Sequence, residues 1–326
     1  MSLATVTVVA TTYTPERLED VRQLLGSLAR QTVAPHEIVF VAEGDPAILE
    51  AVRGFGQALA LGQLTVIQNN GAPGLSGARN AALPHVTGDI VAFIDDDALA
   101  FEDWVEQTIA AFARWPDAIG VTGRALPRWE DPSASWLPVE FYWLISCTDF
   151  TGWTTPQAVR NAWGMNMAFR RESFELVCFD ERRGGNQGAA DGMKLGPLGE
   201  DTQFSLMLRE ATGRPIMFDP SVAVYHRVHG YRTTSRYVRR RAFWEGYTKA
   251  TLPRAGLAVP LHDEFSLLRR VLVGFVPRVA TELIRRPRRG WRQLRLAVDA
   301  LGYVAIGYAA GRLPRIRGWA TRAFGG

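Results

Sequence analysis

Short apolar runs and helix-like spacings alternate through the first hundred residues. Runs rich in Val and Ile at 6–10, 37–41, 64–68 and 90–94 are typical of buried strands. Between them, apolar side chains recur three and four positions apart over 16–30, 47–59 and 77–83, which predicts helices. Strands that alternate with helices in this way form parallel sheets covered on both faces. This part of the chain therefore predicts an α/β fold.

Beyond residue 100 the pattern changes in character. It predicts helices over 104–114 and 202–211, and strands over 120–125, 166–169, 216–218 and 222–225. Between 127 and 163, Pro, Trp and Tyr are dense and no period persists, so we expect a long loop region that sets ligand specificity. The Gly-rich segment 180–198 is expected to be a mobile loop.

Three consecutive carboxylates, Asp95, Asp96 and Asp97, follow the fourth apolar run directly. Adjacent carboxylates repel one another unless a cation or hydrogen bonds neutralise them. Ligands of open α/β sheets bind at the carboxyl ends of the strands, and oxygen ligands there suit Mg²⁺ or Mn²⁺ with a diphosphate. The alternative is a solvated acidic turn that caps the helix beginning near Phe101.

Two segments upstream of the acidic run help to interpret it. Residues 74–82 (GLSGARNAA) precede its strand, and residues 6–13 (VTVVATTY) open the chain with another strand. Together they resemble the family 2 glycosyltransferases, which have the GT-A fold and carry a DxD motif where Asp95–Asp97 stand. The segments 141–144, 159–161, 169–172 and 243–247, together with Asn166, further resemble the archaeal-type glucosyl-dolichyl-phosphate glucuronosyltransferases. The resemblance covers about residues 6–249.

The resemblance implies a fold and a reaction. The expected fold is a Rossmann-like, mostly parallel sheet with helices on both faces, followed by a helical amphipathic C-terminal region. The expected domains are a catalytic domain over 1–250 and a basic amphipathic region over 251–326. The expected reaction is an inverting, metal-dependent transfer of a sugar from a nucleotide-sugar, by default UDP-linked, to a lipid-linked glycan acceptor.

The same resemblance assigns roles around the acidic run. Asp97 is expected to bind Mn²⁺ or Mg²⁺ directly, with Asp95 and His226 completing the shell and His229 as a second candidate. Asp95 also faces the ribose or the base, and Asp96 could serve either purpose. Glu43 stands where many relatives carry Asp. The expected donor-binding residues are Thr11, Thr12, Tyr13, Glu43, Arg79, Asp95 and Asp96, with Arg240 and Arg241. Arg240 or Arg241 could bind the diphosphate of the donor or a lipid phosphate by paired hydrogen bonds, or could lie on a solvated helix face.

An acidic pair, Glu200 and Asp201, begins the predicted helix near residue 202. Negative charges at a helix start interact favourably with the helix dipole, so the pair could simply be an N-terminal cap. In the family, however, the matching pair supplies the general base. Asp201 is the candidate that accepts the proton of the acceptor hydroxyl, with Glu200 as the alternate, which implies a single displacement with inversion.

Charge is distributed unevenly along the chain. Residues 1–226 hold 16 Lys and Arg against 28 Asp and Glu, whereas residues 227–326 hold 21 against 5. Arginines flank apolar blocks in this basic tail, and none of the blocks reaches the roughly 18–20 residues of a membrane-spanning helix. We expect interfacial helices with Trp291, Tyr303 and Trp319 near the headgroups. Alternatively, these helices pack on the catalytic domain or on a second copy.

Composition narrows the location and the partners. The chain has only Cys147 and Cys178, and its N-terminus shows no signal-peptide pattern, so we expect a peripheral protein on the cytoplasmic face of the membrane. A nucleotidyltransferase would carry a Gly-rich turn after the first strand, which residues 11–15 do not provide. The acidic first 226 residues oppose a nucleic-acid-binding module. Transfer to a soluble or polysaccharide acceptor, non-catalytic nucleotide-sugar binding and the oligomeric state remain open.

Overall fold

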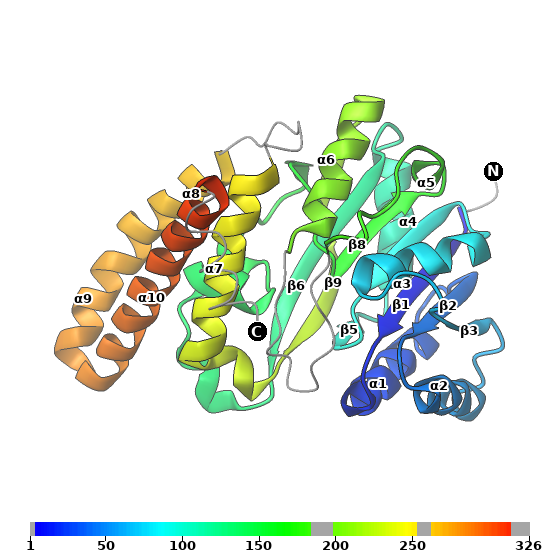
Figure 1. The fold of residues 1–326 in the computed structure, drawn as a ribbon, viewed down its shortest axis with the longest axis horizontal. Helices are drawn as coiled ribbons and strands as arrows, with labels where there is room; N and C mark the ends of the chain where they lie inside the picture. The colour runs from blue at the N-terminus through cyan, green and yellow to red at the C-terminus, as the bar shows by residue number, and fades with distance from the viewer. Residues whose placement is uncertain (1–3, 184–197, 253–261, 314–326) are drawn as a thin grey trace. The chain divides into compact units, whose positions relative to one another are not determined.

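The computed structural model describes residues 4–183, 198–252 and 262–313 (Figure 1). The chain divides into two units. Unit 1 comprises residues 1–125, 154–192 and 199–226, and unit 2 comprises residues 126–153, 193–198 and 227–326. Each unit is described by itself.

The sheet of unit 1 begins with four parallel strands in the order β3-β2-β1-β4. Val8 of β1 lies between Ile38 of β2 and Ala92 of β4 in this register. Three helices connect the four strands, as the alternating pattern predicts. The bounds are β1 Val6–Thr12, α1 Leu18–Ala29, β2 Glu37–Ala42, α2 Pro46–Ala58, β3 Leu64–Gln68, α3 Leu75–Ala82 and β4 Ile90–Ile94.

Antiparallel strands extend the sheet beyond β4. β8 (Asn166–Arg170) pairs with β4, and the order continues through β6 (Gly120–Trp129) and β9 (Ile216–Val228) to β5 (Ala98–Ala100). β7 (Gln157–Val159) pairs with β9. The predicted α/β sheet with a GT-A-like parallel part, β3-β2-β1-β4, is thus confirmed, and the strands beyond β4 add an antiparallel part that the sequence pattern did not specify.

Two details of the strand prediction were wrong. β5 and β7 have three residues each, too few to show a period, and the sequence analysis missed both. The strands expected at 216–218 and 222–225 are one strand, β9. Asp219 and Ser221 interrupt the apolar pattern of β9 without ending the strand. The Asp219 carboxylate accepts hydrogen bonds from the Ser221 amide at 2.9 Å and from the Ser221 hydroxyl at 2.6 Å.

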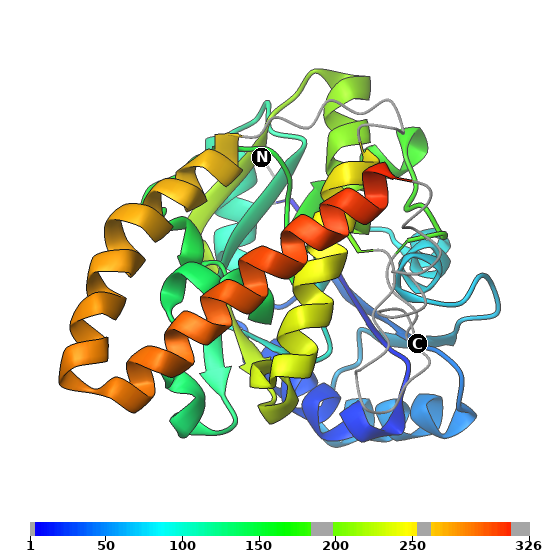
Figure 2. The ribbon, with the colours of Figure 1, turned by 60° about the vertical axis from the view of Figure 1, so that its left-hand side comes forward.

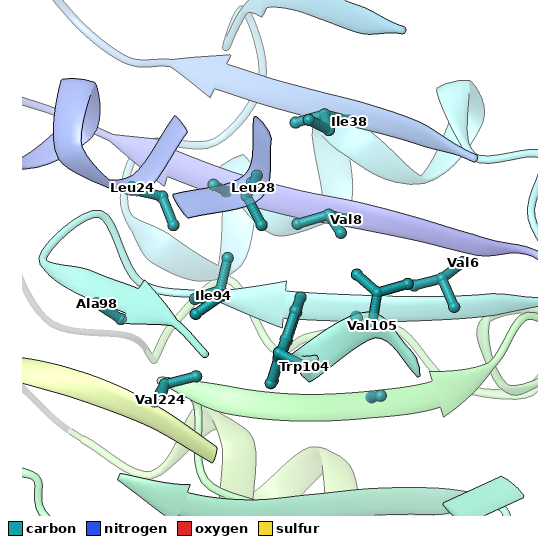
Figure 3. Close-up of a cluster of buried hydrophobic side chains, with 14 of the residues drawn as sticks. Val6, Val8, Leu24, Leu28, Ile38, Ile94, Ala98, Trp104, Val105 and Val224 are labelled. Carbon is teal, nitrogen blue, oxygen red and sulfur yellow. The ribbon is translucent and has the colours of Figure 1, made fainter. Parts of the chain in front are cut away.

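Helices α1 and α4 (Trp104–Arg114) contribute apolar faces to the core of unit 1. Leu24 and Leu28 of α1 gather with Ile94 of β4 and with Trp104 at the start of α4 (Figure 3). The Trp104 indole Nε1 donates to Asn166 Oδ1 at 2.9 Å, so its one polar atom is satisfied inside the core. This packing fixes the end of β4, after which the acidic run begins.

Unit 2 contains residues 127–153 of the segment expected to be a long loop, and its remaining residues, 154–163, belong to unit 1. The part in unit 2 forms three short 3₁₀ helices, Pro132–Trp136, Val139–Ile145 and Asp149–Thr151, which explains the missing α and β periods. Trp136, Phe141 and Leu144 from this segment are buried in an apolar cluster with residues of the C-terminal helices. This part therefore belongs to the core of unit 2. Residues 184–197, most of the expected mobile loop, lie outside the described residues.

A short 3₁₀ helix, Gly230–Thr233, and the helices α7 to α10 account for most of the other described residues of unit 2, and α10 crosses α7 (Figure 2). The crossing is close, because a Cβ built on Gly246 would lie 2.0 Å from the Val304 carbonyl oxygen and one on Gly307 would lie 1.9 Å from that of Phe243. No described helix is both long enough and apolar enough to cross a bilayer. The bounds are α7 Ser235–Thr251, α8 His262–Arg270, a π turn Val271–Phe275, α9 Val276–Arg285 and α10 Pro287–Arg312.

Candidate active site

The carboxylates after β4 meet an imidazole from β9. Asp95, Asp97 and His226 each offer one donor atom within 4.8 Å of the others, and His226 Nε2 lies 3.1 Å from Asp97 Oδ1. Strand pairing explains the encounter, because the antiparallel register of β5 and β9 places Ala98 opposite His226. Asp97, the residue before Ala98, is thereby carried to the imidazole. The structure brings together the three residues that the sequence analysis proposed as metal ligands.

Arg17 supplies the positive charge nearest to this cluster. Its Nη1 lies 2.5 Å from Asp97 Oδ2, 3.8 Å from Asp96 Oδ1 and 3.7 Å from Asp20 Oδ2. Arg17 ends a short 3₁₀ helix, Pro15–Arg17, just beyond the carboxyl end of β1. The sequence analysis missed this residue, although a basic residue directly after the first strand lies at the edge where ligands bind.

Asp96 is held differently from its two neighbours. The Thr12 hydroxyl donates to Asp96 Oδ2 at 2.6 Å, and the other oxygen faces Arg17. Asp96 is not part of the three-residue cluster with His226. It therefore ties the acidic run to the end of β1, and Thr12, predicted as a donor-binding residue, is one of its partners.

Burial dominates the electrostatics of the acidic run. It raises the pKa of Asp95, and it raises the pKa of Asp96 to about 7 against the opposing effect of Arg17. A divalent cation would lower both pKa values, because it would be the largest charge in the site. Two carboxylates and a neutral imidazole form a mixed oxygen and nitrogen donor set, which fits Mn²⁺ better than Mg²⁺, an ion that prefers oxygen ligands.

Arg79 connects the acidic run to the second acidic pair. Its side chain is 2% exposed; Nη1 donates to Glu200 Oε1 at 3.0 Å and Nη2 to Asp95 Oδ1 at 3.4 Å. The guanidinium carbon lies 5.8 Å from the Phe93 ring centre and 5.4 Å from that of Phe179. These contacts fix the guanidinium between two carboxylates. Its predicted contact with the donor stays a prediction.

Asp201 lies beside this bridge, in the first turn of α6 (Glu200–Thr212). Its Oδ2 accepts a hydrogen bond from the Gly164 amide at 2.9 Å, and its Oδ1 accepts one from the Thr202 amide at 2.6 Å. Burial and repulsion from Glu200 raise the pKa of Asp201 to about 6. The residue at the N-cap position is Gly199, so the acidic pair does not act as a side-chain N-cap.

Glu43 follows β2 and fastens the loop that leads into α3. Both carboxylate oxygens accept from the Gly74 amide, at 2.8 and 3.0 Å, and Oε2 accepts from Asn69 Nδ2 at 2.9 Å. Gly74 has φ of 98°, a conformation that favours glycine. Glu43 thus shapes the entrance to the helix that carries Arg79. Thr11 and Tyr13 are partly buried around the end of β1, and their roles toward a nucleotide stay predictions.

The remaining predicted residues belong to unit 2. Arg240 is 5% exposed within α7, and Arg241 Nη1 lies 3.7 Å from Glu245 Oε2. A contact of either arginine with a donor phosphate stays a prediction. His229 Nδ1 lies 3.7 Å from Glu130 Oε1, and the three-residue cluster contains His226 instead.

The sequence is similar to known sugar-transferring proteins. The pattern of the family described as Glycosyl transferase family 2 matches residues 7–177. The glucosyl-dolichyl phosphate glucuronosyltransferase of Haloferax volcanii is 29% identical over 314 residues, which cover 94% of this chain and 96% of that protein. The succinoglycan biosynthesis protein ExoM of Rhizobium meliloti is 26% identical over 246 residues, which cover 75% of this chain and 73% of that protein.

Solved structures share the fold. The mannosyltransferase PcManGT of Pyrobaculum calidifontis, solved with GDP-Man and Mn²⁺, superposes with a TM-score of 0.61 at 21% identity, covering 96% of this chain and 88% of that one. GalNAc-T7, solved with UDP, GalNAc and Mn²⁺, gives a TM-score of 0.50 at 18% identity, covering 82% and 54%. With the family pattern, the GT-A-like sheet and the Asp95–Asp97 motif at its edge, the chain belongs to glycosyltransferase family 2.

Proposed function

We propose that this glycosyltransferase moves a sugar from a UDP-sugar to a lipid-linked acceptor, with inversion at the anomeric carbon. The observation that carries the proposal is the arrangement around Arg79, whose guanidinium joins Asp95 of the three-residue cluster to Glu200 of the acidic pair. A site for a diphosphate-bound cation and a site for a base are thereby held by one buried side chain in unit 1.

Asp95, Asp97 and His226 are the residues that would hold Mn²⁺ in this proposal. When bound there, the ion would stabilise the negative charge that develops on the departing diphosphate. Arg17 holds Asp97 and faces Asp96, so it reduces the mutual repulsion of the carboxylates before a donor arrives. Thr12 fixes Asp96 from the end of β1.

Asp201 is the proposed general base. A carboxylate with a pKa of about 6 is ionised at neutral pH and is more basic than an ordinary aspartate, which suits proton removal from a hydroxyl. The Gly164 amide orients one of its oxygens. Glu200 is engaged by Arg79, so we assign it a positioning role. One base and no enzymic nucleophile imply a single displacement, and hence inversion.

The proposed acceptor is a polyprenyl or dolichyl phosphate that carries a sugar, at the cytoplasmic face of the membrane. The support is the similarity to a glucosyl-dolichyl phosphate glucuronosyltransferase over nearly the whole chain, together with the basic charge of residues 227–326. Glucuronate is accordingly the first donor sugar to test. The similarity to a succinoglycan biosynthesis protein makes a polysaccharide precursor the acceptor to compare.

The proposal is tested by offering radiolabelled UDP-glucuronate, UDP-glucose and GDP-mannose with glucosyl-dolichyl phosphate, in Mn²⁺ and in EDTA. We expect Mn²⁺-dependent label in the lipid fraction from one UDP-sugar, with the anomeric configuration of the product opposite to that of the donor. The folded variant Asp201→Asn is the matched control for background. Transfer in EDTA, or a retained configuration, would overturn the mechanism. Transfer only to a water-soluble oligosaccharide would overturn the lipid acceptor.

A further inference from the structure

The turn between α9 and α10 presents a concentrated positive charge. Residues 284–291 read Ile-Arg-Arg-Pro-Arg-Arg-Gly-Trp, and six arginines but no acidic residue lie between Glu282 and Asp299. α9 ends at Arg285 and α10 begins at Pro287, so Arg285, Arg286, Arg288 and Arg289 lie at or next to the junction of the two helices; residues 284–291 are called the α9–α10 turn here (Figure 2). All four are exposed, and Arg289 Nε lies 3.8 Å from Glu282 Oε2.

Two large apolar side chains flank these arginines. Ile284 is 83% exposed and Trp291 is 64% exposed. Among the described residues, twelve of the fourteen exposed large apolar side chains lie between Phe265 and Leu313, and unit 1 contributes only Leu176 and Tyr225. Exposed apolar side chains at this density, next to arginines, mark an interaction surface and need a partner that is both anionic and apolar.

Packing within unit 2 keeps these side chains outside. The inward positions of the two helices are taken by Val279, Leu296 and Ala300, all buried in the apolar cluster of unit 2. The turn is tight as well, because a Cβ built on Gly290 would lie 2.6 Å from the Leu283 amide nitrogen. Ile284 and Trp291 therefore cannot fold inward without displacing the core.

We propose that the α9–α10 turn docks on an anionic phospholipid surface, with its arginines on lipid phosphates and Ile284 and Trp291 among the headgroups. This docking rests on the proposed lipid-linked acceptor and names the part of the chain that reaches the membrane. Guanidinium groups bind phosphates by paired hydrogen bonds, and Trp is favoured at the depth of the headgroups.

Charge and exposure favour this partner over two others. A second copy docking through the same turn would bring twelve arginines together with few acidic groups, which is repulsive. A nucleic acid would satisfy the arginines, and a single strand could stack a base on Trp291, but it would offer no apolar surface to Ile284. An anionic bilayer provides phosphates and apolar surface together.

The docking is tested by flotation of the full-length protein with vesicles of phosphatidylcholine alone or with a third of phosphatidylglycerol. We expect binding to the anionic vesicles only. Replacing Arg285, Arg286, Arg288 and Arg289 with Gln should weaken it by about 100-fold or more, and Ile284→Ser with Trp291→Ser by about tenfold or more. The matched controls in unit 1, Arg22→Gln with Arg53→Gln and Leu176→Ser, should bind like the parent. Equal losses in controls and turn variants would overturn the proposal.

A local probe separates insertion from simple charge attraction. Cys147 is buried and Cys178 exposed, so Ile284→Cys in a Cys178→Ser background offers one accessible thiol for a polarity-sensitive dye. The dye should brighten severalfold on anionic vesicles, whereas the same dye at Leu176→Cys should not change. No change at position 284 during vesicle binding would overturn the docking. If the dye brightens as much on RNA as on vesicles, RNA replaces the membrane as the partner. If light scattering shows a dimer of the parent that the turn variants do not form, a second copy of the chain replaces it.

Calorimetric measurement of UDP binding in the presence of Mn²⁺ distinguishes a failure of this inference from a failure of the proposed function. The turn variants should bind UDP like the parent, because the candidate active site lies in unit 1. If neither the parent nor any variant transfers sugar to lipid, and only the turn variants lose vesicle binding, the proposed acceptor is wrong and the docking stands. If transfer to lipid occurs but the turn variants still float, the docking is wrong and the proposed function stands.

Discussion

Arg17 and Asp97 form an ion pair at the centre of the candidate active site, with Arg17 Nη1 2.5 Å from Asp97 Oδ2. The other oxygen of the same carboxylate lies 3.1 Å from His226 Nε2. One carboxylate thus faces a permanent cation of the chain and an imidazole that can bind a metal. The chain's own cation and an incoming metal ion therefore act on the same group.

Replacing Arg17 with Ala should tighten Mn²⁺ binding. A positive charge within about 4–6 Å of a bound cation costs on the order of 3 kcal/mol at the effective dielectric constant of a protein surface, so a gain of at least about tenfold is expected. Without metal, the variant should melt at a lower temperature than the parent, because three acidic neighbours lose their cation. Calorimetric titration with Mn²⁺ measures the first effect. Arg22→Ala is the exposed control, and unchanged or weaker Mn²⁺ binding in Arg17→Ala would contradict the competition.

Asp97→Ala should abolish Mn²⁺-dependent binding of UDP while the fold survives. The substitution removes one metal ligand and one of several repelling carboxylates, and Arg17 keeps Asp96 and Asp20 as neighbours. The shift in melting temperature on adding UDP with Mn²⁺ is the measurement. The exposed Asp117→Ala should respond like the parent. A folded Asp97→Ala protein that keeps the full Mn²⁺-dependent shift would remove Asp97 from the ligand set.

Asp201→Asn should lower the transfer rate by about 10²–10⁴-fold and leave UDP binding unchanged, because the amide keeps an acceptor oxygen for Gly164 but cannot take a proton. Single-turnover transfer and calorimetry give the two quantities. Glu200→Gln serves as the comparison, since it should weaken the Arg79 contact and affect both quantities. An active Asp201→Asn beside an inactive Glu200→Gln would exchange the two roles.

The same Asp201→Asn substitution should stabilise the fold in a pH-dependent way. Asp201 has a pKa of about 6 in the folded protein against 3.8 as its ordinary value. The folded state thus holds the proton more tightly, so the parent loses stability as pH rises from about 4 to about 6. Asparagine avoids that loss. Urea unfolding should therefore show a gain for the variant above pH 6 and none below pH 4, and a gain that does not change with pH would refute the assigned pKa.

Two glycines of α10 should respond oppositely to alanine. Nothing lies within 4 Å of a Cβ built on Gly302, so Gly302→Ala should stabilise by about 0.5–1 kcal/mol through helix propensity. A Cβ on Gly307 would lie 1.9 Å from the Phe243 carbonyl oxygen, so Gly307→Ala must push α10 away from α7 and should destabilise by about 2 kcal/mol or more. Thermal unfolding of the two variants makes the comparison. Equal stability would mean that the two helices do not pack this closely.

The local pattern of apolar residues was sufficient to predict most regular strands and helices of unit 1. The segments 64–68, 90–94 and 104–114 were predicted to the residue, because a run of branched residues or an amphipathic period specifies each without help from distant parts. The family resemblance then placed Asp97 and His226 in one site. Arg17 could not be found in this way, because its pairing with Asp97 depends on the order of β1 and β4 in the sheet.

The elements that the pattern missed are those that depend on tertiary contacts. β5 has three residues and exists through its pairing with β9, which also brings His226 to the acidic run. The 3₁₀ helices between Pro132 and Thr151 bury aromatic side chains without an α or β period. Their burial is decided by the helices α7, α9 and α10, which follow much later in the chain. Contacts between segments so far apart produce no short-range pattern from which a single sequence could predict them.

The crossing of α7 and α10 also has a consequence for the order of events at the ribosome. Every residue of unit 1 has been synthesised once His226 is added, whereas the face of α7 that contains Gly246 lacks its packing partner until α10 has been made. Unit 1 can therefore assemble before residues 227–313 have been made. The arginine-rich turn forms only when both α9 and α10 are present, so a nascent chain brings Asp95, Asp97 and His226 together before it forms the α9–α10 turn.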